Sequence, residues 1–373
     1  MKELYLDNSA TTKVYPRVVK VMDRVMLADY GNPSSAHALG DKASKIVSSS
    51  RTKIANSLGA KKHEIFFTSG TTESNNWAIS GLASANPTKK KIMISSIEHP
   101  SVREVCKSLK KLRYKIVEIP VNNEGFVDLK FIEENIDSNT LLVSIIHGNN
   151  IFGTVQNLKK IGDICRKNKV LFHTDAAQTF GKLKTLVHDW NIDLLSASGH
   201  KIGGPKGIGF LYIREGIKIN PLIYGGGQEK GLRSGTENVA GIVGLDKALE
   251  ITLKKNWTTV SNNRNYLIEK LESIGARLIG SQIDRVPNNI FVTLPNVNAE
   301  RLLYDLSNKG VYVSVESACD SKKETEDHAL QSIGLSSKEM KSSIRISLPA
   351  EVTKKDIDYF LRVLKNILDR FKN

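Results

Sequence analysis

The segment DLLSASGHKIGGPKGIGFLYI, residues 193–213, carries the clearest fold signal in the chain. Two short apolar runs flank a glycine-rich turn that contains Lys201. Continuous apolar runs of this length, bounded by turn residues, indicate buried β-strands. The first run ends in serine, glycine and histidine, so polar groups fall at a strand end, where open α/β sheets bind their ligands.

Five similar runs precede this segment, and stretches with helical patterns separate them. They read EIFFTSG, KIMISS, YKIVEIP, TLLVSIIH and VLFHTDA, between residues 64 and 176. Strands that alternate with helices predict the α/β class, with a mostly parallel sheet covered by helices on both faces. We expect this large domain to span residues 14–255.

The last third of the chain follows a different pattern. A long helical region from about residue 239 to residue 274 precedes NNIFVTLP, AERLLYDLSNKG, VYVSVES and SSIRISL, which suit a smaller α+β domain. We expect that domain to comprise residues 256–373 together with residues 1–13, and to carry the loop around Cys319.

The composition is that of a globular protein with a basic surface. The 373 residues include 54 Lys and Arg against 39 Asp and Glu, a net charge of +15. The lysines are spread along the chain without a compact basic block that includes aromatic residues, so direct nucleic-acid binding is not expected. No apolar run approaches the ~20 residues of a membrane helix, and the N-terminus lacks the apolar core of a secretory signal. These features predict a cytoplasmic protein that does not bind membranes.

The chain has three cysteines, which are too few for a disulfide framework, and no C-x-x-C pair suggests a zinc site. Cys106 and Cys165 lie in helical patterns beside apolar residues, where packed thiols are expected. Cys319 lies instead among serines, carboxylates and lysines, in VSVESACDSKKETEDH at residues 313–328. A reactive thiol needs such a polar, accessible setting. An incidental exposed cysteine is the alternative.

Lys201 follows the predicted strand over residues 193–199. A lysine at an apolar sheet edge loses its proton more readily and can form a Schiff base with a carbonyl cofactor. A plain surface lysine is the alternative, and the spacing of a P-loop is absent.

Asp175 ends the strongly apolar run VLFHTDA, an expensive place for a carboxylate without a partner. The protonated ring nitrogen of pyridoxal phosphate is one such partner. A metal ligand or a structural ion pair would also explain the residue. With Lys201 after the next strand, the cofactor interpretation gains support.

A phosphate site is predicted in FFTSGTTESNNWAI, residues 66–79, where a strand leads into a helix N-terminus. Gly70, Thr71 and Thr72 would hold the anion there. An ordinary helix cap at or near Thr72 is the alternative. His99, directly before Pro100, could stack on a cofactor ring and relay protons, although a structural histidine is common at such a place.

Taken together, the motifs of this chain resemble those of the group I cysteine desulfurases. The motifs occur in the order and spacing of that family over nearly the whole chain: LDNSATT, GNPSSAH, FTSGTTESNN, EHPSV, HGNNIFG, DAAQTFGK, SGHKIGGPKG, GGGQEKGLRSGTENV, SAC and SSIRISL. The resemblance implies a pyridoxal-phosphate enzyme of the aspartate-aminotransferase fold (fold type I) that acts as a homodimer. Related aminotransferases and selenocysteine lyases share several motifs, and Cys319 favours a desulfurase.

The resemblance also implies roles for individual residues. Lys201 would bind the cofactor, Asp175 would pair with its ring nitrogen and His99 would stack on the ring. Asn150 and Gln178 would hydrogen-bond the ring oxygen of the cofactor. Thr72, Ser198 and His200 would bind its phosphate, which Thr236 would reach from the second subunit. Arg345, with Asn150, would bind the substrate carboxylate.

The implied reaction converts L-cysteine to L-alanine and leaves a persulfide on Cys319. A sulfur-accepting protein would then use it for iron–sulfur cluster assembly or tRNA thiolation. The chain departs from the family at Glu316, where a glycine is frequent, at Ile151, where an acidic residue is common, and in the residues after Cys319. The alternatives are a selenocysteine lyase, a related aminotransferase, or a basic module that binds RNA or protein without catalysis.

Overall fold

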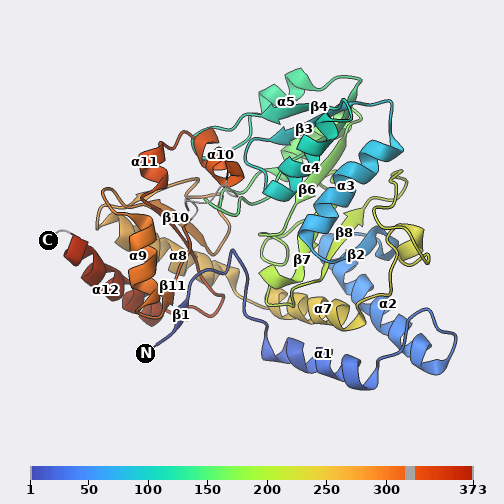
Figure 1. The fold of residues 1–373 in the computed structure, drawn as a ribbon, viewed down its shortest axis with the longest axis horizontal. Coiled ribbons are helices and arrows are strands. Elements are labelled where there is room, and N and C mark those ends of the chain that lie inside the picture. Colours follow the sequence, from blue (N-terminus) through green and yellow to red (C-terminus); the bar gives the residue numbers. More distant parts are fainter. Residues whose placement is uncertain (1, 316–323, 372–373) are drawn as a thin grey trace.

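A computed structural model describes residues 2–315 and 324–371, with the side chains of residues 324–327 excepted. Cys319 and Glu316 therefore lie outside the described residues. The ribbon has a larger part built on one wide sheet and a smaller part that contains the C-terminus (Figure 1).

All seven apolar runs form strands of one sheet, in the order β2-β8-β7-β6-β5-β3-β4. Strand β8 pairs antiparallel with both β2 and β7, and the other neighbours are parallel. The predicted mostly parallel sheet is confirmed. The strands are β2 Ile65–Thr68, β3 Lys91–Ser95, β4 Lys115–Ile119, β5 Thr140–Ser144, β6 Leu171–Asp175, β7 Leu194–Ser198 and β8 Gly209–Ile213.

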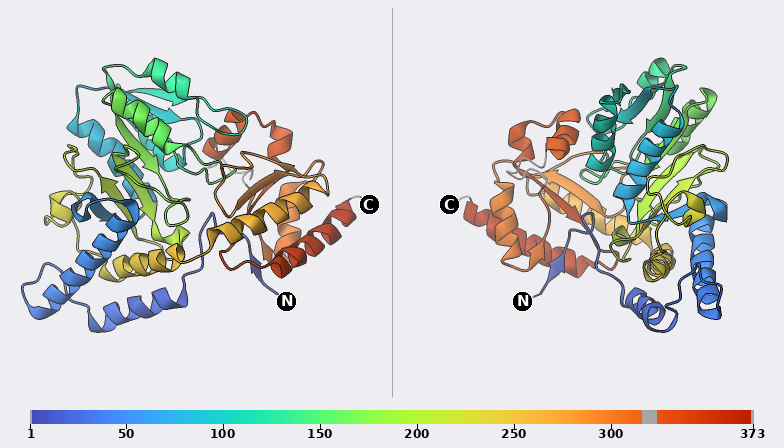
Figure 2. Two further views of the ribbon diagram at one scale, coloured as in Figure 1. Left: turned by 180° about the vertical axis from the view of Figure 1, so that it is seen from behind. Right: turned by 45° about the vertical axis from the view of Figure 1, so that its right-hand side comes forward.

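Different helices cover the two faces of this sheet, as Figures 1 and 2 show. Trp77 and Cys106, from α3 and α4, pack with Phe66 and Leu211 on one face. On the other face, a larger core includes Cys165 and residues of the remaining large-sheet helices. Both cysteines are buried, as expected. The helices are α1 Pro16–Ala28, α2 Ala38–Leu58, α3 Thr71–Ala85, α4 Pro100–Lys110, α5 Leu129–Asn135, α6 Leu158–Lys167 and α7 Val239–Leu253, with short 3-10 turns at Lys62–Glu64, Gly199–Lys201 and Glu229–Gly231.

The smaller part has its own core. Strand β10 (Asn289–Thr293) pairs antiparallel with β12 (Ser343–Ser347) and β9 (Arg277–Leu278), and β1 (Leu4–Tyr5) pairs in parallel with β11 (Val311–Tyr312). Leu4 and Leu6 pack in the same cluster as the C-terminal residues. The predicted domain limits stay a prediction. The helices here are α8 Trp257–Glu272, α9 Ala299–Ser307, α10 Glu324–Ser332, α11 Ser337–Met340 and α12 Lys354–Phe371.

The expected helical region over residues 239–274 is confirmed, but it is divided. The chain forms two helices, because α7 ends at Leu253 and α8 begins at Trp257. Asn256 starts the second helix by accepting a hydrogen bond from the backbone N–H of Thr259 at 3.1 Å. An N-cap of this kind stabilises a new helix start even inside a continuous helical pattern.

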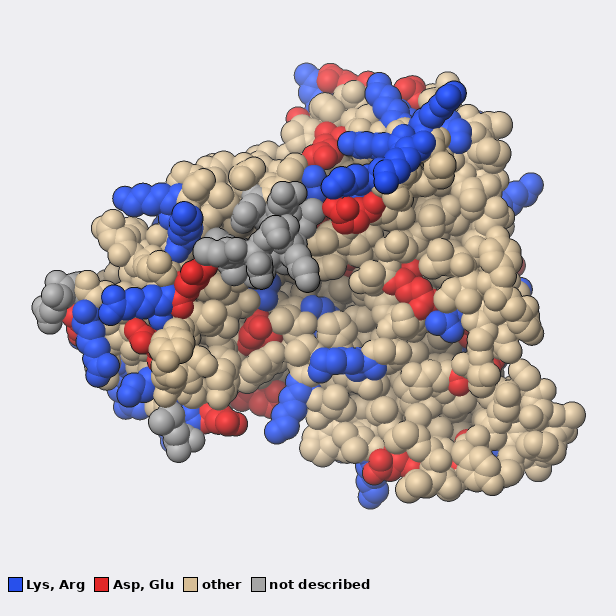
Figure 3. Space-filling model, viewed as in Figure 1, with Lys and Arg blue, Asp and Glu red and all other residues tan. Residues whose placement is uncertain are grey.

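The basic residues are less evenly placed than the sequence suggested. Figure 3 shows lysine and arginine gathering at the upper right of one face, over the region of α3 and α4, with acidic residues among them. Exposed lysines at positions 107, 110 and 111 belong to α4 and the turn after it. Within the described residues, no helix is both long and apolar enough to cross a membrane.

Candidate active site

A cavity of about 750 Å³ lies at the C-terminal ends of the sheet strands. Strand β6 ends at Asp175 and β7 leads into Lys201, while α3 and α4 start directly after β2 and β3. The cavity brings together residues that the sequence placed in six separate motifs. The predicted site residues on its wall are Gly70, Thr71, Thr72, His99, Asn150, Asp175, Gln178, His200, Lys201 and Arg345.

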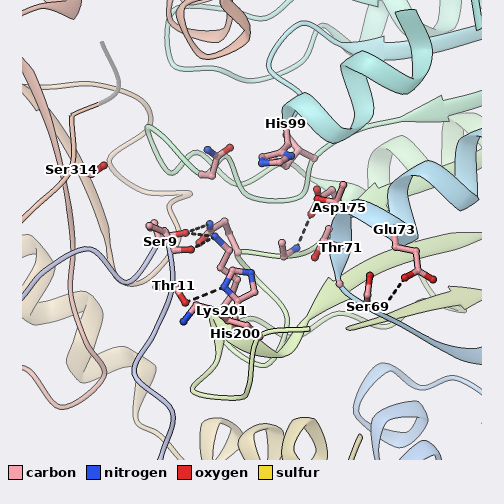
Figure 4. Close-up of a pocket in the computed structure, with 18 of the residues that line it drawn as sticks. Ser9, Thr11, Ser69, Thr71, Glu73, His99, Asp175, His200, Lys201 and Ser314 are labelled. Carbon is pink, nitrogen blue, oxygen red and sulfur yellow. Dashed lines mark hydrogen bonds between the residues drawn. The ribbon is translucent and has the colours of Figure 1, made fainter. Parts of the chain in front are cut away.

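Lys201 is held by the backbone of the N-terminal segment (Figure 4). Its Nζ donates hydrogen bonds to the carbonyl oxygens of Ser9, at 2.5 Å, and Ala10, at 2.8 Å. Lys206 lines the same cavity. Two lysines are therefore available to a carbonyl ligand, and Lys201 is the one fixed between the ends of the sheet and the N-terminal segment.

Asp175 lies buried, with 2% of its surface exposed. Its Oδ2 accepts a hydrogen bond from Asn75 Nδ2 at 2.8 Å, and its Oδ1 accepts one from the backbone N–H of Ala177 at 2.9 Å. Neutral donors orient this carboxylate without neutralising it. A buried anion in such a place favours a cationic group on the ligand.

His99 caps α4, and Pro100 occupies its first helical position. The His99 Nδ1 accepts a hydrogen bond from the backbone N–H of Ser101 at 3.1 Å. Burial lowers the pKa of His99, and the nearby charge of Asp175 only partly opposes this. The imidazole is therefore neutral at pH 7, and a neutral imidazole can stack on the flat ring of an aromatic ligand.

The N-terminus of α3 opens on the cavity. Gly70 is the N-cap and α3 begins at Thr71, so Thr72 lies near the cap, as the alternative interpretation had it, but no side chain caps the helix. Gly70 has φ 155° and ψ −179°, a conformation that is essentially restricted to glycine. The first-turn amides and the helix dipole at this end of a 15-residue helix favour an anion.

Further groups at the same end fit an anion. Burial, followed by the charges of Lys201 and Lys206, lowers the pKa of His200 to about 4, so its ring is neutral at pH 7. Among the described residues, no hydrogen-bond partner is found for two buried hydroxyl oxygens, Oγ1 of Thr71 and Oγ of Ser198.

Arg345 comes from β12 of the smaller part and is 5% exposed. Its Nη2 lies 3.0 Å from Asp7 Oδ1, and its Nη1 donates to the carbonyl oxygen of Asn150 at 3.2 Å. These contacts fix the guanidinium on the cavity wall, where it can meet a carboxylate.

Two predicted residues are not on the wall of this cavity. Thr236 lines a smaller neighbouring cavity of about 200 Å³, which shares Ser69 and Gly207 with the first. Ser198 lies at the end of β7 and is buried. Cys319 lies outside the described residues. Within those residues, no group of His, Cys, Asp and Glu side chains could hold a metal ion.

Comparison with known proteins decides the family. The family model described as "Aminotransferase class-V" matches residues 4–360. The chain belongs to the class-V aminotransferase family. The protein "Cysteine desulfurase IscS" of Clostridium botulinum is 42% identical to this class-V chain, over 98% of this chain and 94% of the relative.

Solved structures agree with this class-V fold. The structure described as "NIFS-LIKE PROTEIN" superposes with a TM-score of 0.93 at 39% identity, covering 99% of this chain and all of that one. A second, "SspA in complex with cysteine", has a TM-score of 0.84 at 36% identity, covering 94% of this chain and all of that one. The predicted fold class and the family resemblance are confirmed.

Sequence reasoning missed several residues of this class-V site. Asn75 lies one helical turn inside α3, and its contact with Asp175 follows only from how α3 packs on β6. Ser9 and Ala10 act through backbone carbonyls, which have no sequence signal of their own. Burial raises the pKa of Glu98 to about 8, and the residue could have been noticed as a carboxylate soon after the apolar run KIMISS.

Proposed function

We propose that this protein is a pyridoxal-phosphate-dependent cysteine desulfurase that converts L-cysteine to L-alanine and passes the sulfur to Cys319. The observation that carries the proposal is the meeting of Lys201, Asp175 and Arg345 around one cavity. The curated relative named as a cysteine desulfurase and the neighbour solved "in complex with cysteine" support the same reaction.

The described residues fit the cofactor. Two buried oxygens without a partner would serve the phosphate: Thr71 Oγ1, at the N-terminus of α3 on the cavity wall, and Ser198 Oγ, at the end of β7. Gln178 and Asn150, both on the cavity wall, would meet the ring oxygen. Gly70 has open space where a side chain would stand. When bound, pyridoxal phosphate supplies an electron sink that stabilises a carbanion at the α-carbon of the substrate.

Each protein group then has a separate task. The Lys201 amine would hold the cofactor and, once released by the substrate amine, move the α-proton. Asp175 would keep the ring nitrogen protonated, and the neutral His99 would cover the ring face. Arg345 would bind the substrate carboxylate through two parallel hydrogen bonds, a geometry that guanidinium suits.

Sulfur leaves the substrate in the last step of this reaction. The Cys319 thiolate attacks the sulfur of the bound cysteine, the substrate Cβ–S bond breaks, and Cys319 keeps the sulfur as a persulfide. The bonding electrons pass to Cβ, which gains a proton and becomes the methyl group of alanine. We further propose a homodimer, with Thr236 reaching the phosphate of the neighbouring subunit, and a sulfur-accepting protein that serves iron–sulfur cluster assembly or tRNA thiolation. The cytoplasmic location stays a prediction.

Two variants test the proposal. Lys201→Ala should lose the visible absorption of lysine-bound pyridoxal phosphate, whereas the control Lys206→Ala should keep it. Cys319→Ala should keep that absorption but lose alanine formation, and mass spectrometry after incubation with L-cysteine should find no added sulfur. Alanine formation by Cys319→Ala at the wild-type rate would contradict the role of this thiol. A marked preference for L-selenocysteine would favour a selenocysteine lyase instead.

A further inference from the structure

A second cavity lies behind Lys201. It has a volume of about 480 Å³ and shares Lys201 with the cavity described above, so this lysine forms part of the wall between the two. The second cavity is lined by Lys201, Ile202, Lys182, Thr252, Trp257 and Asn288. None of the tasks proposed above uses it.

Lys182 is the unusual residue of this second cavity. It follows Asp175 in the motif DAAQTFGK, and only 6% of its surface is exposed. Its Nζ donates a long hydrogen bond of 3.4 Å to Asn288 Oδ1 and lies 5.9 Å from the centre of the Trp257 ring. Among the described residues, no carboxylate forms an ion pair with this amine. A buried ammonium without a counter-charge is costly.

Burial, followed by the charge of Lys201, lowers the pKa of Lys182 to about 7. Two amines on one buried wall repel each other when both carry a proton. The carbonyl oxygens of Ser9 and Ala10 act in the opposite direction, because they stabilise the ammonium form of Lys201. The proton affinity of Lys201 thus depends on whether Lys182 is charged.

Some of the charged groups around the second cavity have partners of their own. At the rim of the second cavity, Lys2 pairs with Asp356 at 2.6 Å, and Glu351 pairs with Lys255 at 2.5 Å. The remaining titratable groups on its wall are Glu3, Tyr5, Lys13 and Tyr15. Those that line the front cavity beside Lys201 are Glu73, His99, Asp175, His200, Lys206 and Arg345.

We propose that Lys182 is a positioning residue for Lys201, a second buried amine whose charge favours the neutral, nucleophilic form of the Lys201 amine. The inference rests on the proposed function in one respect, because Lys201 must be the cofactor lysine for the effect to matter in catalysis. Lys182 itself is not on the wall of the front cavity, where cofactor and substrate would bind.

The first test is the pH titration of the visible absorption of the purified holoenzyme. Lys182→Met removes the charge at similar length, so the midpoint should rise by on the order of 1 pH unit. Lys182→Arg keeps a permanent charge, so its midpoint should stay at or below that of the wild type. Lys13→Met is the matched control, because this exposed lysine lines the mouth of the same cavity, and its midpoint should not move.

A merely structural role gives a different result. Loss of packing would lower the melting temperature of both Lys182 variants without separating their midpoints. Coinciding midpoints for Lys182→Met and wild type would overturn the proposal, and so would a rise in both variants.

The second test does not depend on the cofactor. The Lys201 amine of the cofactor-free full chain is labelled with acetic anhydride at a series of pH values, and peptide mass spectrometry reports the labelled fraction. Lys182→Met should shift the labelling midpoint of Lys201 upward, and an unchanged midpoint would reject the inference. The two proposals can fail separately. If Lys182→Met shifts the labelling midpoint of Lys201 but the wild-type protein shows no visible absorption after incubation with pyridoxal phosphate, the proposed function is rejected and the inference about Lys182 stands.

Discussion

At the scale of single residues, Arg345 gives the sharpest prediction about the substrate. Lysine at this position keeps the charge but cannot form two parallel hydrogen bonds with a carboxylate. Arg345→Lys should therefore raise the KM for L-cysteine roughly ten- to a hundredfold, the equivalent of about 1.5–3 kcal/mol, and leave the cofactor absorption intact.

The matched control is Arg277→Lys, because Arg277 is more than half exposed and pairs with Glu339 away from the cavity. Its steady-state kinetics should match the wild type. An unchanged KM in Arg345→Lys would remove this residue from the substrate site.

The sequence predicted the charged and hydroxyl-bearing wall of the site, because these side chains sit at the ends of recognisable strands. It did not predict partners that act across the fold. The Asp175 contact with Asn75 joins residues a hundred positions apart, and the Lys201 contacts use backbone oxygens. Thr236 lies in the neighbouring cavity of the single chain. Side-chain chemistry can be read from sequence, whereas packing partners and backbone donors depend on the complete fold.

At the scale of elements, the start of α3 makes a testable claim about Gly70. Its φ of 155° and ψ of −179° suit glycine, and a Cβ would meet no atom within 4 Å, so the cost of alanine is conformational rather than steric. Gly70→Ala should lose about 1–3 kcal/mol of stability and weaken pyridoxal-phosphate binding, because the first turn of α3 would shift.

Gly275→Ala provides the control for this prediction. Gly275 has φ 90°, also with open space around it, in the turn after α8 and away from the cavity. It should show a comparable fall in melting temperature, while the Kd for pyridoxal phosphate stays at the wild-type value. A Gly70 variant with wild-type cofactor affinity would show that α3 does not hold the phosphate.

Elements differed in how well their sequence revealed them. The seven strands of the large sheet were found because buried strands read as continuous apolar runs. The break between α7 and α8 was missed, since residues 254–256 interrupt no apolar pattern and only the Asn256 cap marks the new start. The antiparallel placement of β8 between β2 and β7 was not predicted either, because pairing partners are far apart in the chain.

At the scale of the whole molecule, the N-terminal segment connects the two parts around the site. Leu4 pairs with Val311 in the smaller part, and Asp7 reaches Arg345. A few residues later, Thr12 donates to the carbonyl oxygen of His200 at 2.9 Å and accepts from the backbone N–H of Gly203 at 2.7 Å. The segment thus ties the Arg345 side of the cavity to the turn that carries Lys201, which no local pattern in LDNSATT could have revealed.

Stability toward acid is also a property of the whole molecule, and two buried histidines predict its direction. Burial lowers the pKa of His147 and of His173 to about 3. The ordinary pKa of histidine is near 6.5, so below that pH the unfolded chain binds protons that the folded chain does not. The resulting stability is fully present above about pH 6.5 and is lost progressively as the pH falls toward 3.

His173→Gln tests this prediction, because His173 lies between Ser144 of β5, at 2.8 Å, and Ser196 of β7, at 3.0 Å, and an amide can also donate and accept there. The variant should be less stable than the wild type at pH 7.5. Its melting temperature should nevertheless fall less steeply between pH 6.5 and 5, since each such histidine contributes up to about 1.4 kcal/mol per pH unit. His63→Gln, at a largely exposed histidine, should keep the wild-type slope. If the melting temperatures of His173→Gln and the wild type fall in parallel with pH, the buried ring must take up a proton in the folded state. Burial of His173 between the strands would then not cause the loss of stability in acid.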